Sequence, residues 1–416
     1  MTAAVAPGMR IAFLSVSGEM GGSEVSLLEL VRGLRRLVPA WPLDLVVPRE
    51  GPLAAAARAC GASVHVLPLP SRLARLGETS GRGASDILGR GLSIVMAAGS
   101  INPYSRRLAR LLARLAPDVL HTNGFKLHVL GARAAPPAAA LVWHIHEYVA
   151  RRPISRALLG RYAPRGARIV ANSRSVAADV TAALGELPVT TIYNAVDPAE
   201  FRPEGDVLDL DALAGLPPAP AGTVRVGLVA TYGRWKGHAT FLAALGRLNA
   251  SAPVRAYIVG GALYDTIGSQ YTRRELEAAI AAAGLGGRVG VTGFVDRPAA
   301  AMRALDVVVH ASTRPEPFGL VIAEGLATGR AVIVSAGGGA AELVTDGVDA
   351  VTHVPGDVDG LARCIARVVE DPALRIRLGA AARTSALRQF DPDAFTRAFI
   401  DVYQEARPRL RTDVRH

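Results

Sequence analysis

Cysteine is nearly absent from this sequence. Only Cys60 and Cys364 occur among 416 residues, far apart and without a CxxC pair. This excludes a disulfide framework and a cysteine-based zinc site, and it predicts that both thiols are small, buried hydrophobic side chains. A chain of this kind suits a reducing compartment, and we expect it in the cytoplasm.

Long hydrophobic runs are absent as well. The apolar run near the N-terminus covers residues 11–16, and AVIVSA and VVVHA further along are no longer than a strand. Segments this short do not span a bilayer, and no secretory signal is visible. We therefore expect a soluble chain, and a peripheral position at the inner face of the membrane stays open.

Lysine is the third scarcity, because only Lys126 and Lys236 are lysine among 47 basic residues. Residues 1–205 hold 24 basic side chains against 14 acidic ones, whereas residues 206–416 hold 23 against 22. The basic first half favours an acidic partner, such as an anionic membrane or a phosphorylated substrate. The alternative is an arginine bias spread over solvated surface. Nucleic acid is not expected, because no binding motif accompanies the charge.

Short apolar runs alternate with helical patterns along the chain. MRIAFLSV, WPLDLVVP, DVLHTN and ALVWHIHE are typical of strands, and the alternation restarts with VRVGLVA after a Pro- and Gly-rich connection at 198–222. This pattern predicts parallel α/β sheets of the Rossmann type. The length predicts two such domains, residues 1–205 and 222–389, facing across a deep cleft, and the C-terminal residues from about 390 to 416 are expected to begin with a helix.

Residues 72–104 break this rhythm and are expected to form a long loop or irregular helical insert. The helix that follows has leucines on one face and Arg106, Arg107, Arg110 and Arg114 elsewhere. Such a basic amphipathic helix either lies on a membrane or packs its apolar face on the sheet, and the pattern does not separate the two.

The segment PEPFGLVIAEGLATG places Glu316 and Glu324 in an apolar stretch. It follows a strand, so Glu316 is expected on a loop at the carboxyl edge of the sheet, and Gly319 and Leu320 are expected to open a helix. The free N–H groups of a helix start favour phosphate, and Glu324 lies about one and a half turns further. Two carboxylates beside an anion site suit a nucleotide sugar; a solvated loop residue and a surface charge are the alternative.

The segment ATYGRWKGH places Arg234 and Lys236 at the end of another strand of the same sheet. Two cations there can neutralise a diphosphate leaving group. Lys236 is one of only two lysines, which favours a site that needs a compact point charge.

These segments, read together, resemble the family-4 retaining glycosyltransferases of the GT-B fold. The likeness lies in six motifs in the family's order: MGGSE, VWHIHE, ANS with YNAVD, GRWKG, GFVDRPAAAMRALDVVVHAS and PEPFGLVIAEGLATG. It covers most of the chain, and it implies that the C-terminal helix at about 390–416 packs back on the first domain. The resemblance implies transfer of a sugar from a UDP- or GDP-linked donor to an acceptor hydroxyl, with retention and without a metal or other cofactor.

The resemblance also implies roles for single residues. Glu316 would hold hydroxyls of the donor sugar, Glu324 the ribose, and Lys236 the phosphates, while His146 would face the transferred sugar. The remaining donor contacts that it implies are Gly21, Gly22, Arg234, Val295, Phe318, Gly319 and Leu320. The sequence departs from the family at GRWKG, where the loop is compressed. Either Thr231 or Arg234 therefore takes the place of the family's usual arginine.

The D-x-D strings at 209–211, 357–359 and 391–393 are expected to be turns and helix caps rather than metal ligands, and the nine histidines show no close ligand spacing. An epimerase on the same fold and a noncatalytic sugar-nucleotide-binding subunit stay open as alternatives. A nicotinamide dehydrogenase is not expected, because no G-x-G-x-x-G follows the first strand. The acceptor, whether carbohydrate, lipid-linked or a small molecule, is left undetermined.

Overall fold

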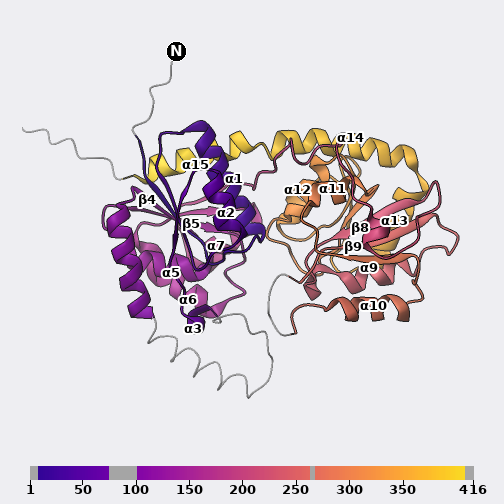
Figure 1. Ribbon diagram of the computed structural model, residues 1–416, viewed down its shortest axis with the longest axis horizontal. Helices are drawn as coiled ribbons and strands as arrows, with labels where there is room; N and C mark the ends of the chain where they lie inside the picture. Colours follow the sequence, from indigo (N-terminus) through magenta and orange to yellow (C-terminus); the bar gives the residue numbers. More distant parts are fainter. Residues whose placement is uncertain (1–7, 75–100, 263–267, 408–416) are drawn as a thin grey trace, which may run out of the picture. The chain divides into compact units, whose positions relative to one another are not determined.

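The computed structural model describes residues 8–74, 101–262 and 268–407. The chain divides into two compact units, Met1–Asn194 with Pro392–His416, and Ala195–Asp391. The division falls at Asn194, before the connection at 198–222, so that connection belongs to the second unit. Each unit is an α/β sandwich built on one parallel sheet (Figure 1).

The first unit holds a seven-stranded parallel sheet with the order β3-β2-β1-β4-β5-β6-β7. Because β1 is flanked by β2 and β4, the order reverses there, and the carboxyl ends of β1 and β4 mark the usual ligand position of such sheets. The strands are β1 (Ile11–Leu14), β2 (Leu43–Val47), β3 (Ser63–Val66), β4 (Val119–Asn123), β5 (Ala140–Ile145), β6 (Arg168–Ala171) and β7 (Val189–Thr191).

Helices cover both faces of this sheet, as the right-handed crossovers of parallel strands require. They are α1 (Gly22–Leu37), α2 (Pro52–Ala59), α3 (Ser71–Ala74), α5 (Phe125–Ala134), α6 (Pro153–Tyr162), the short η1 (Ala163–Arg165), α7 (Arg174–Leu184) and the C-terminal α15 (Pro392–Ala406), with residues 101–115 also helical. Most of the expected insert at 72–104 lies outside the described residues. Helix 101–115 buries Leu108, Leu111 and Leu112 in the core, so its apolar face packs on the sheet and not on a membrane.

Helix α15 returns to the first unit and packs on α1 and β5 (Figure 1). Phe399 and Tyr403 are fully buried in this contact. The helices approach closely because Gly33 has no side chain: a Cβ there would lie 1.9 Å from Oγ1 of Thr396. The C-terminal segment is therefore a structural part of the first unit.

The second unit holds a six-stranded parallel sheet with the order β10-β9-β8-β11-β12-β13. Its order reverses at β8 and β11, where the carboxyl ends again mark the expected ligand position. The strands are β8 (Val224–Val229), β9 (Val254–Val259), β10 (Val289–Gly293), β11 (Val307–His310), β12 (Ala331–Ser335) and β13 (Val351–His353). The helices are α8 (Leu210–Leu213), η2 (Arg234–Lys236), α9 (His238–Leu245), α10 (Arg273–Ala282), α11 (Pro298–Arg303), α12 (Leu320–Ala327), η3 (Gly339–Glu342), α13 (Val358–Glu370) and α14 (Pro372–Gln389).

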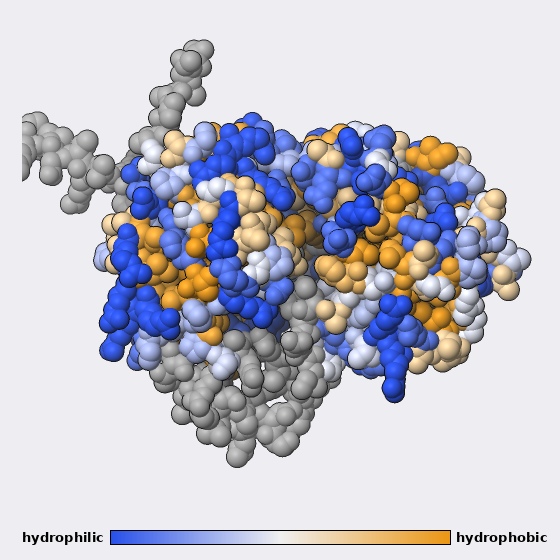
Figure 2. Space-filling model, viewed as in Figure 1, coloured by the Kyte–Doolittle hydropathy of each residue, from blue (hydrophilic) through white to orange (hydrophobic). Residues whose placement is uncertain are grey.

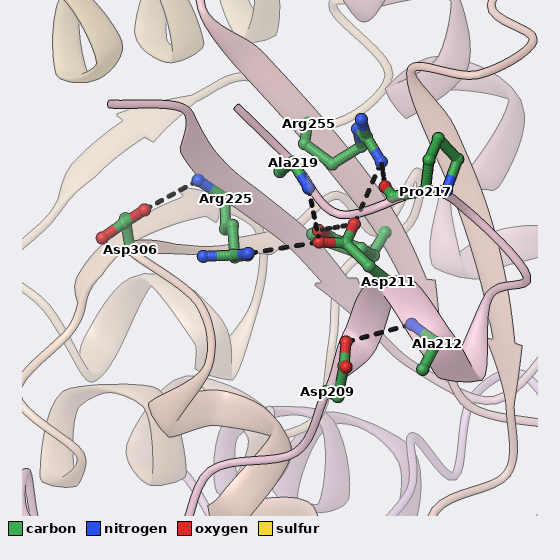
Figure 3. Close-up of polar contacts among 9 residues, drawn as sticks. Asp209, Asp211, Ala212, Pro217, Ala219, Arg225, Arg255 and Asp306 are labelled. Carbon is green, nitrogen blue, oxygen red and sulfur yellow. Dashed lines mark hydrogen bonds and ion pairs between the residues drawn. The ribbon is translucent and has the colours of Figure 1, made fainter. Parts of the chain in front are cut away.

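The connection before β8 is fastened to this second sheet by Asp211 (Figure 3). The buried Asp211 carboxylate accepts hydrogen bonds from Tyr257 Oη at 2.7 Å, Arg255 Nη1 at 3.0 Å, Arg225 Nη2 at 3.2 Å and the N–H of Ala219 at 3.0 Å. Burial alone would raise the pKa of Asp211, but these donors outweigh it and hold the pKa below its ordinary value. The connection is thus held against β8 and β9 by the contacts of Asp211.

Three other carboxylates of the D-x-D strings also make structural contacts. Asp209 caps α8 through the N–H of Ala212, and Asp357 caps α13 through the N–H of Gly360. Asp393 pairs with Arg36 and links α15 to α1. Among the described residues no group of three or more His, Cys, Asp or Glu side chains is placed to hold a metal ion.

Candidate functional site

The loops that leave β8 and β11 are locked together by a glycine. Gly237 has φ of +84°, and a Cβ at this position would lie 1.8 Å from the carbonyl oxygen of Ala311. No other residue allows this approach. The N–H of Thr313 also donates to the carbonyl oxygen of Trp235 at 2.8 Å. As a result Lys236 is held at the exit of β11, which is the position where the strand order reverses.

Glu316 lies at the centre of this site and is almost fully buried. Nζ of Lys236 lies 2.9 Å and 3.1 Å from its two carboxylate oxygens. Its Oε2 also accepts from Oγ of Ser312 at 2.7 Å and lies 3.3 Å from Nε2 of His310. Burial alone would raise the pKa of Glu316, but the charge of Lys236 and the hydrogen bond from His310 outweigh it and lower the pKa far below the ordinary value. Glu316 is therefore an ionised carboxylate with several donors.

A third loop, which follows β12, fixes the backbone of Glu316. The N–H of Glu316 donates to the carbonyl oxygen of Gly337 at 3.0 Å, and the N–H of Gly339 donates to the carbonyl oxygen of Glu316 at 2.8 Å. Loops from β8, β11 and β12 thus meet around one carboxylate. Such placement from three strands keeps the carboxylate oriented before any ligand binds.

Helix α12 begins directly after this carboxylate. Gly319 precedes it with φ of +96°, and no side chain caps the helix start. The N-terminus of α12 therefore offers backbone donors and the positive end of the helix dipole to an anion. Leu320 opens the helix and is half-buried, whereas the side chain of Phe318 is buried against Phe390, with ring centroids 6.0 Å apart. Phe318 contributes its backbone, not its ring, to the surface of this site.

Glu324 lies further along α12, half-buried, in a very different environment from Glu316. Burial, and secondly the negative charge of Glu200, raises its pKa to about 8. Two carboxyl groups eight residues apart therefore have opposite protonation states near neutral pH, which is a common feature of functional sites.

The raised pKa predicts a pH-dependent stability for the second unit. Folded Glu324 keeps a proton that the unfolded chain releases near pH 4.5, so the contribution of Glu324 to stability is present below pH 4.5 and is lost as the pH rises to about 8. We expect Glu324→Gln to stabilise the unliganded protein at pH 8 by roughly 1–2 kcal/mol, after allowance for partial exposure, and to have little effect at pH 4.5. Thermal melts at both pH values test this. The surface variant Glu277→Gln is the control, and equal melts of Glu324→Gln and wild type at pH 8 would contradict the assignment.

Arg234 does not join Lys236 in this structure. Its Nη2 donates to Oε1 of Glu275 at 2.7 Å, and its guanidinium lies over the ring of Tyr271, 4.3 Å from the centroid. It is directed toward the start of α10, away from Glu316. Thr231 is half-buried, and so is Val295, which lies two residues after the end of β10. The structure therefore brings Lys236, Glu316, Gly319 and Leu320 together and holds Arg234 apart.

His310, Ser312 and Trp235 belong to this site but were not singled out from the sequence. Nζ of Lys236 lies 4.1 Å from the ring centroid of Trp235, a cation–π contact that orients the lysine. His310 and Ser312 are polar residues directly at the end of the apolar strand β11, and polar residues at the carboxyl end of a buried strand are a signal that could have found them.

The corresponding edge of the first unit holds Gly21, Gly22 and His146. Gly21 is buried and precedes α1, whose first residue, Gly22, is exposed. Nε2 of His146 lies 3.4 Å from Oδ1 of Asn123 at the end of β4, and burial lowers the pKa of His146 to about 3. His146 is therefore a neutral imidazole at pH 7.

Three histidines that are separated in the sequence meet at this edge. The ring centroids of His144 and His146 are 3.9 Å apart, and those of His121 and His144 are 5.4 Å apart. Nδ1 of His121 lies 2.7 Å from Oη of Tyr403 on α15. These rings pack together because His144 on β5, His146 directly after it and His121 on neighbouring β4 project from the same face. The sequence predicted no cluster of histidine ligands, and among the described residues none is placed to hold a metal ion.

Comparison with known proteins identifies the family of this chain. Residues 218–385 match the family of glycosyl transferases group 1, and residues 20–200 match glycosyltransferase family 4. The chain belongs to these glycosyltransferases. The two matches cover the two units in turn, so the family and the paired α/β architecture expected from the motifs are confirmed.

The glycosyltransferase has curated and structural relatives. D-inositol 3-phosphate glycosyltransferase of Nocardioides sp. is 32% identical over 238 residues, which cover 54% of this chain and 50% of the relative. A lipopolysaccharide core mannosyltransferase of Rhizobium leguminosarum is 32% identical over 194 residues, covering 47% and 53%. The chain thus spans about half the length of these curated relatives. The structure of Anabaena HepE in complex with UDP-glucose is 25% identical with a TM-score of 0.78, covering 95% of this chain and all of that one.

No helix within the described residues is long and apolar enough to cross a membrane.

Proposed function

We propose that the enzyme transfers a sugar from a UDP- or GDP-linked donor to an acceptor hydroxyl with retention of configuration. The observation that carries this proposal is the contact of Lys236 with both oxygens of buried Glu316, beside the uncapped start of α12. A cation, a hydrogen-bonding carboxylate and a helix N-terminus suit a diphosphate joined to a polyhydroxyl group. HepE, solved with UDP-glucose, gives independent support for a nucleotide-sugar donor.

In the proposed reaction the ammonium group of Lys236 contacts the diphosphate of the donor in place of the Glu316 carboxylate. The lysine and the first N–H groups of α12 then stabilise the negative charge that develops as the diphosphate leaves. The freed oxygens of Glu316 accept hydrogen bonds from hydroxyls of the transferred sugar, and Glu324, protonated near neutral pH, can both donate to and accept from ribose hydroxyls. Lys236 and the N-terminus of α12 supply positive charge to the phosphates, so the proposal includes no metal or other cofactor.

Retention is proposed to proceed by attack of the acceptor on the face that the diphosphate leaves, through an oxocarbenium-like state. The acceptor oxygen forms the new glycosidic bond, and the departing phosphate takes its proton. His146, as a neutral imidazole, is proposed to hydrogen-bond the transferred sugar rather than to exchange a proton with it, because its pKa of about 3 makes it a poor base. Gly21, Gly22 and Val295 are proposed to lie along the donor.

The acceptor is proposed to be a carbohydrate, a lipid-linked sugar or a small polyhydroxyl molecule. The names of the relatives include an inositol phosphate, the lipopolysaccharide core and 2-deoxystreptamine, all of which are hydroxyl-rich. The enzyme is proposed to act in the cytoplasm, and its basic first unit is proposed to contact the inner face of the membrane.

A thermal-shift panel with UDP-, GDP- and ADP-sugars tests the donor site. We expect one nucleotide class to raise the melting temperature of the wild type, and we expect the shift to be lost in Glu324→Ala because the ribose contacts are removed. The matched control is Glu277→Ala, whose carboxylate forms a surface pair with Arg273 on α10 and should leave the shift intact. No shift with any of the donors, or an equal shift in Glu324→Ala, would contradict the proposed site.

A further inference from the structure

Helix α6 presents apolar side chains to solvent on one face. Ile154 is 57% exposed and Leu158 is 41% exposed, whereas Leu159 and Tyr162 are buried in the core of the first unit. Residues four apart lie on the same side of a helix, so Ile154 and Leu158 form one outward-facing apolar strip. Ala157 lies between them in the sequence and is exposed as well.

The strip lies in a part of the sequence that is rich in positive charge. Residues 148–178 contain seven arginines and no acidic residue. The carboxylates that flank this segment in the sequence are already engaged: Glu147 pairs with Arg152 at 2.9 Å, and Asp179 accepts from the backbone N–H groups of Val149 and Ala150. The exposed arginines on α6 and within six residues of its ends are Arg151, Arg152, Arg156, Arg161, Arg165 and Arg168. The apolar strip thus lies in a segment whose charged side chains are all arginines.

The neighbouring helices extend this basic surface. Arg133 at the end of α5 donates to Oη of Tyr162 at 2.7 Å and to Oδ1 of Asn102 at 2.7 Å, so it joins α6 to helix 101–115. That helix keeps its apolar side in the core and exposes Arg106, Arg107, Arg110 and Arg114. On the part of the first unit that is visible in Figure 2, hydrophilic and hydrophobic residues are interleaved. Helix α6 supplies the apolar part of this surface, and helix 101–115 adds charge alone.

We propose that the outer face of α6 docks on a bilayer that contains anionic lipids. An apolar face bordered by arginines is the composition of helices that lie in the membrane interface, where apolar groups enter the acyl boundary and arginines meet phosphates. The inference specifies the surface for the proposed membrane contact of the first unit. It is independent of the donor site.

Two other occupants fit this face less well. A second copy of the chain in a two-fold dimer would bring the arginines of one α6 against those of the other, which is electrostatically unfavourable. Single-stranded nucleic acid needs exposed aromatic rings for stacking, but Tyr148 and Tyr162 beside the strip are buried. A surface rich in phosphate with an apolar layer beneath it satisfies both halves of the face.

Co-sedimentation of the full chain with lipid vesicles tests the proposal. The wild type is expected to bind vesicles that contain phosphatidylglycerol and to bind phosphatidylcholine vesicles much more weakly, with binding reduced by added salt. The double variant Ile154→Ser/Leu158→Ser should bind the anionic vesicles at least roughly tenfold more weakly than the wild type. Arg161→Gln should weaken binding by a smaller factor. Both positions of the double variant are exposed, so folding should be unaffected.

The control is Ile376→Ser/Leu387→Ser, which removes two exposed apolar side chains from α14 in the second unit. It should bind vesicles like the wild type. Equal binding of the α6 variant and the control, or equal binding of the wild type to both vesicle types, overturns the proposal. So does a dimer of the wild type that the α6 variant dissociates in analytical ultracentrifugation. The thermal-shift panel with the donors is also run on these variants. Because the α6 face is independent of the donor site, the shift should equal that of the wild type, so the two proposals are tested separately.

Discussion

Lys236→Met should lower kcat/KM for sugar transfer by about 10²- to 10³-fold, equivalent to about 2.7–4 kcal/mol of transition-state stabilisation. The reason is that Lys236 is the cation that the β8 loop holds beside Glu316 at 2.9 Å, whereas Arg234 is engaged with Glu275. A leaving diphosphate would then meet the start of α12 without the ammonium group of Lys236. The loss should fall on kcat, because the charge on the leaving group develops in the transition state.

The variant has a second consequence that must be measured separately. Without Lys236 the buried carboxylate of Glu316 keeps only His310 and Ser312 as side-chain donors among the contacts described above, so the second unit should also lose stability. The double variant Lys236→Met/Glu316→Gln should recover part of that stability without recovering activity. A double-mutant cycle on melting temperature and on kcat separates the two effects.

Arg247→Met is a suitable control for the loss of a cation. Arg247 forms an exposed ion pair with Asp359 in the second unit, and exposed pairs contribute little. Steady-state assays with the donor found in the thermal-shift panel should show near wild-type rates for this variant. If Lys236→Met kept its kcat and lost only stability, Lys236 would be a structural partner of Glu316 and not a group that stabilises the leaving phosphate.

Asp211→Ala should destabilise the second unit by about 3–5 kcal/mol. Its carboxylate accepts from Tyr257, Arg255, Arg225 and the backbone of Ala219, and Arg255 is itself buried. Removal of the carboxylate leaves a buried guanidinium without its anion. It also releases the connection at 198–222 from β8 and β9. This cost is that of an uncompensated charge and not of a single hydrogen bond.

Hydrogen exchange measured by mass spectrometry suits this test, because it reports each unit separately where a single unfolding free energy does not. Faster exchange is expected in β8 and β9, with the strands of the first unit unchanged. Asp209→Ala is the matched control two residues away, because it removes only the cap of α8 and should cost about 1 kcal/mol. Equal effects of the two variants would contradict the role assigned to Asp211.

Much of the architecture follows from local sequence pattern. Strands such as VRVGLVA and LDVVVHAS are apolar on both faces because helices cover both sides of a parallel sheet, and that pattern is visible without any tertiary information. The chemistry of Lys236 and Glu316 was also accessible, because each follows such a strand and carboxyl ends of parallel strands share one edge. The motifs that surround them led to the family that the comparisons confirm.

Other features depend on contacts between residues far apart in the chain. Arg234 and Lys236 are two positions apart, yet one contacts Glu275 and the other Glu316, because the short turn η2 projects them to different sides. Asp209 and Asp211 have the same local pattern, but only Asp211 meets Arg255 and Tyr257 from β9.

The sequence by itself determined the fold class, the family and the two residues at the centre of the candidate site, because periodicity and motif order are local properties. The tertiary structure alone decided which amphipathic helix is exposed. Helix 101–115 and α6 both combine leucine with arginine. Helix 101–115 buries most of its leucines, whereas α6 leaves two large apolar side chains, Ile154 and Leu158, in solvent. It also decided that the carboxylate of Glu316 is ionised and that the pKa of Glu324 is raised, because a pKa depends on burial and on charges contributed by distant segments.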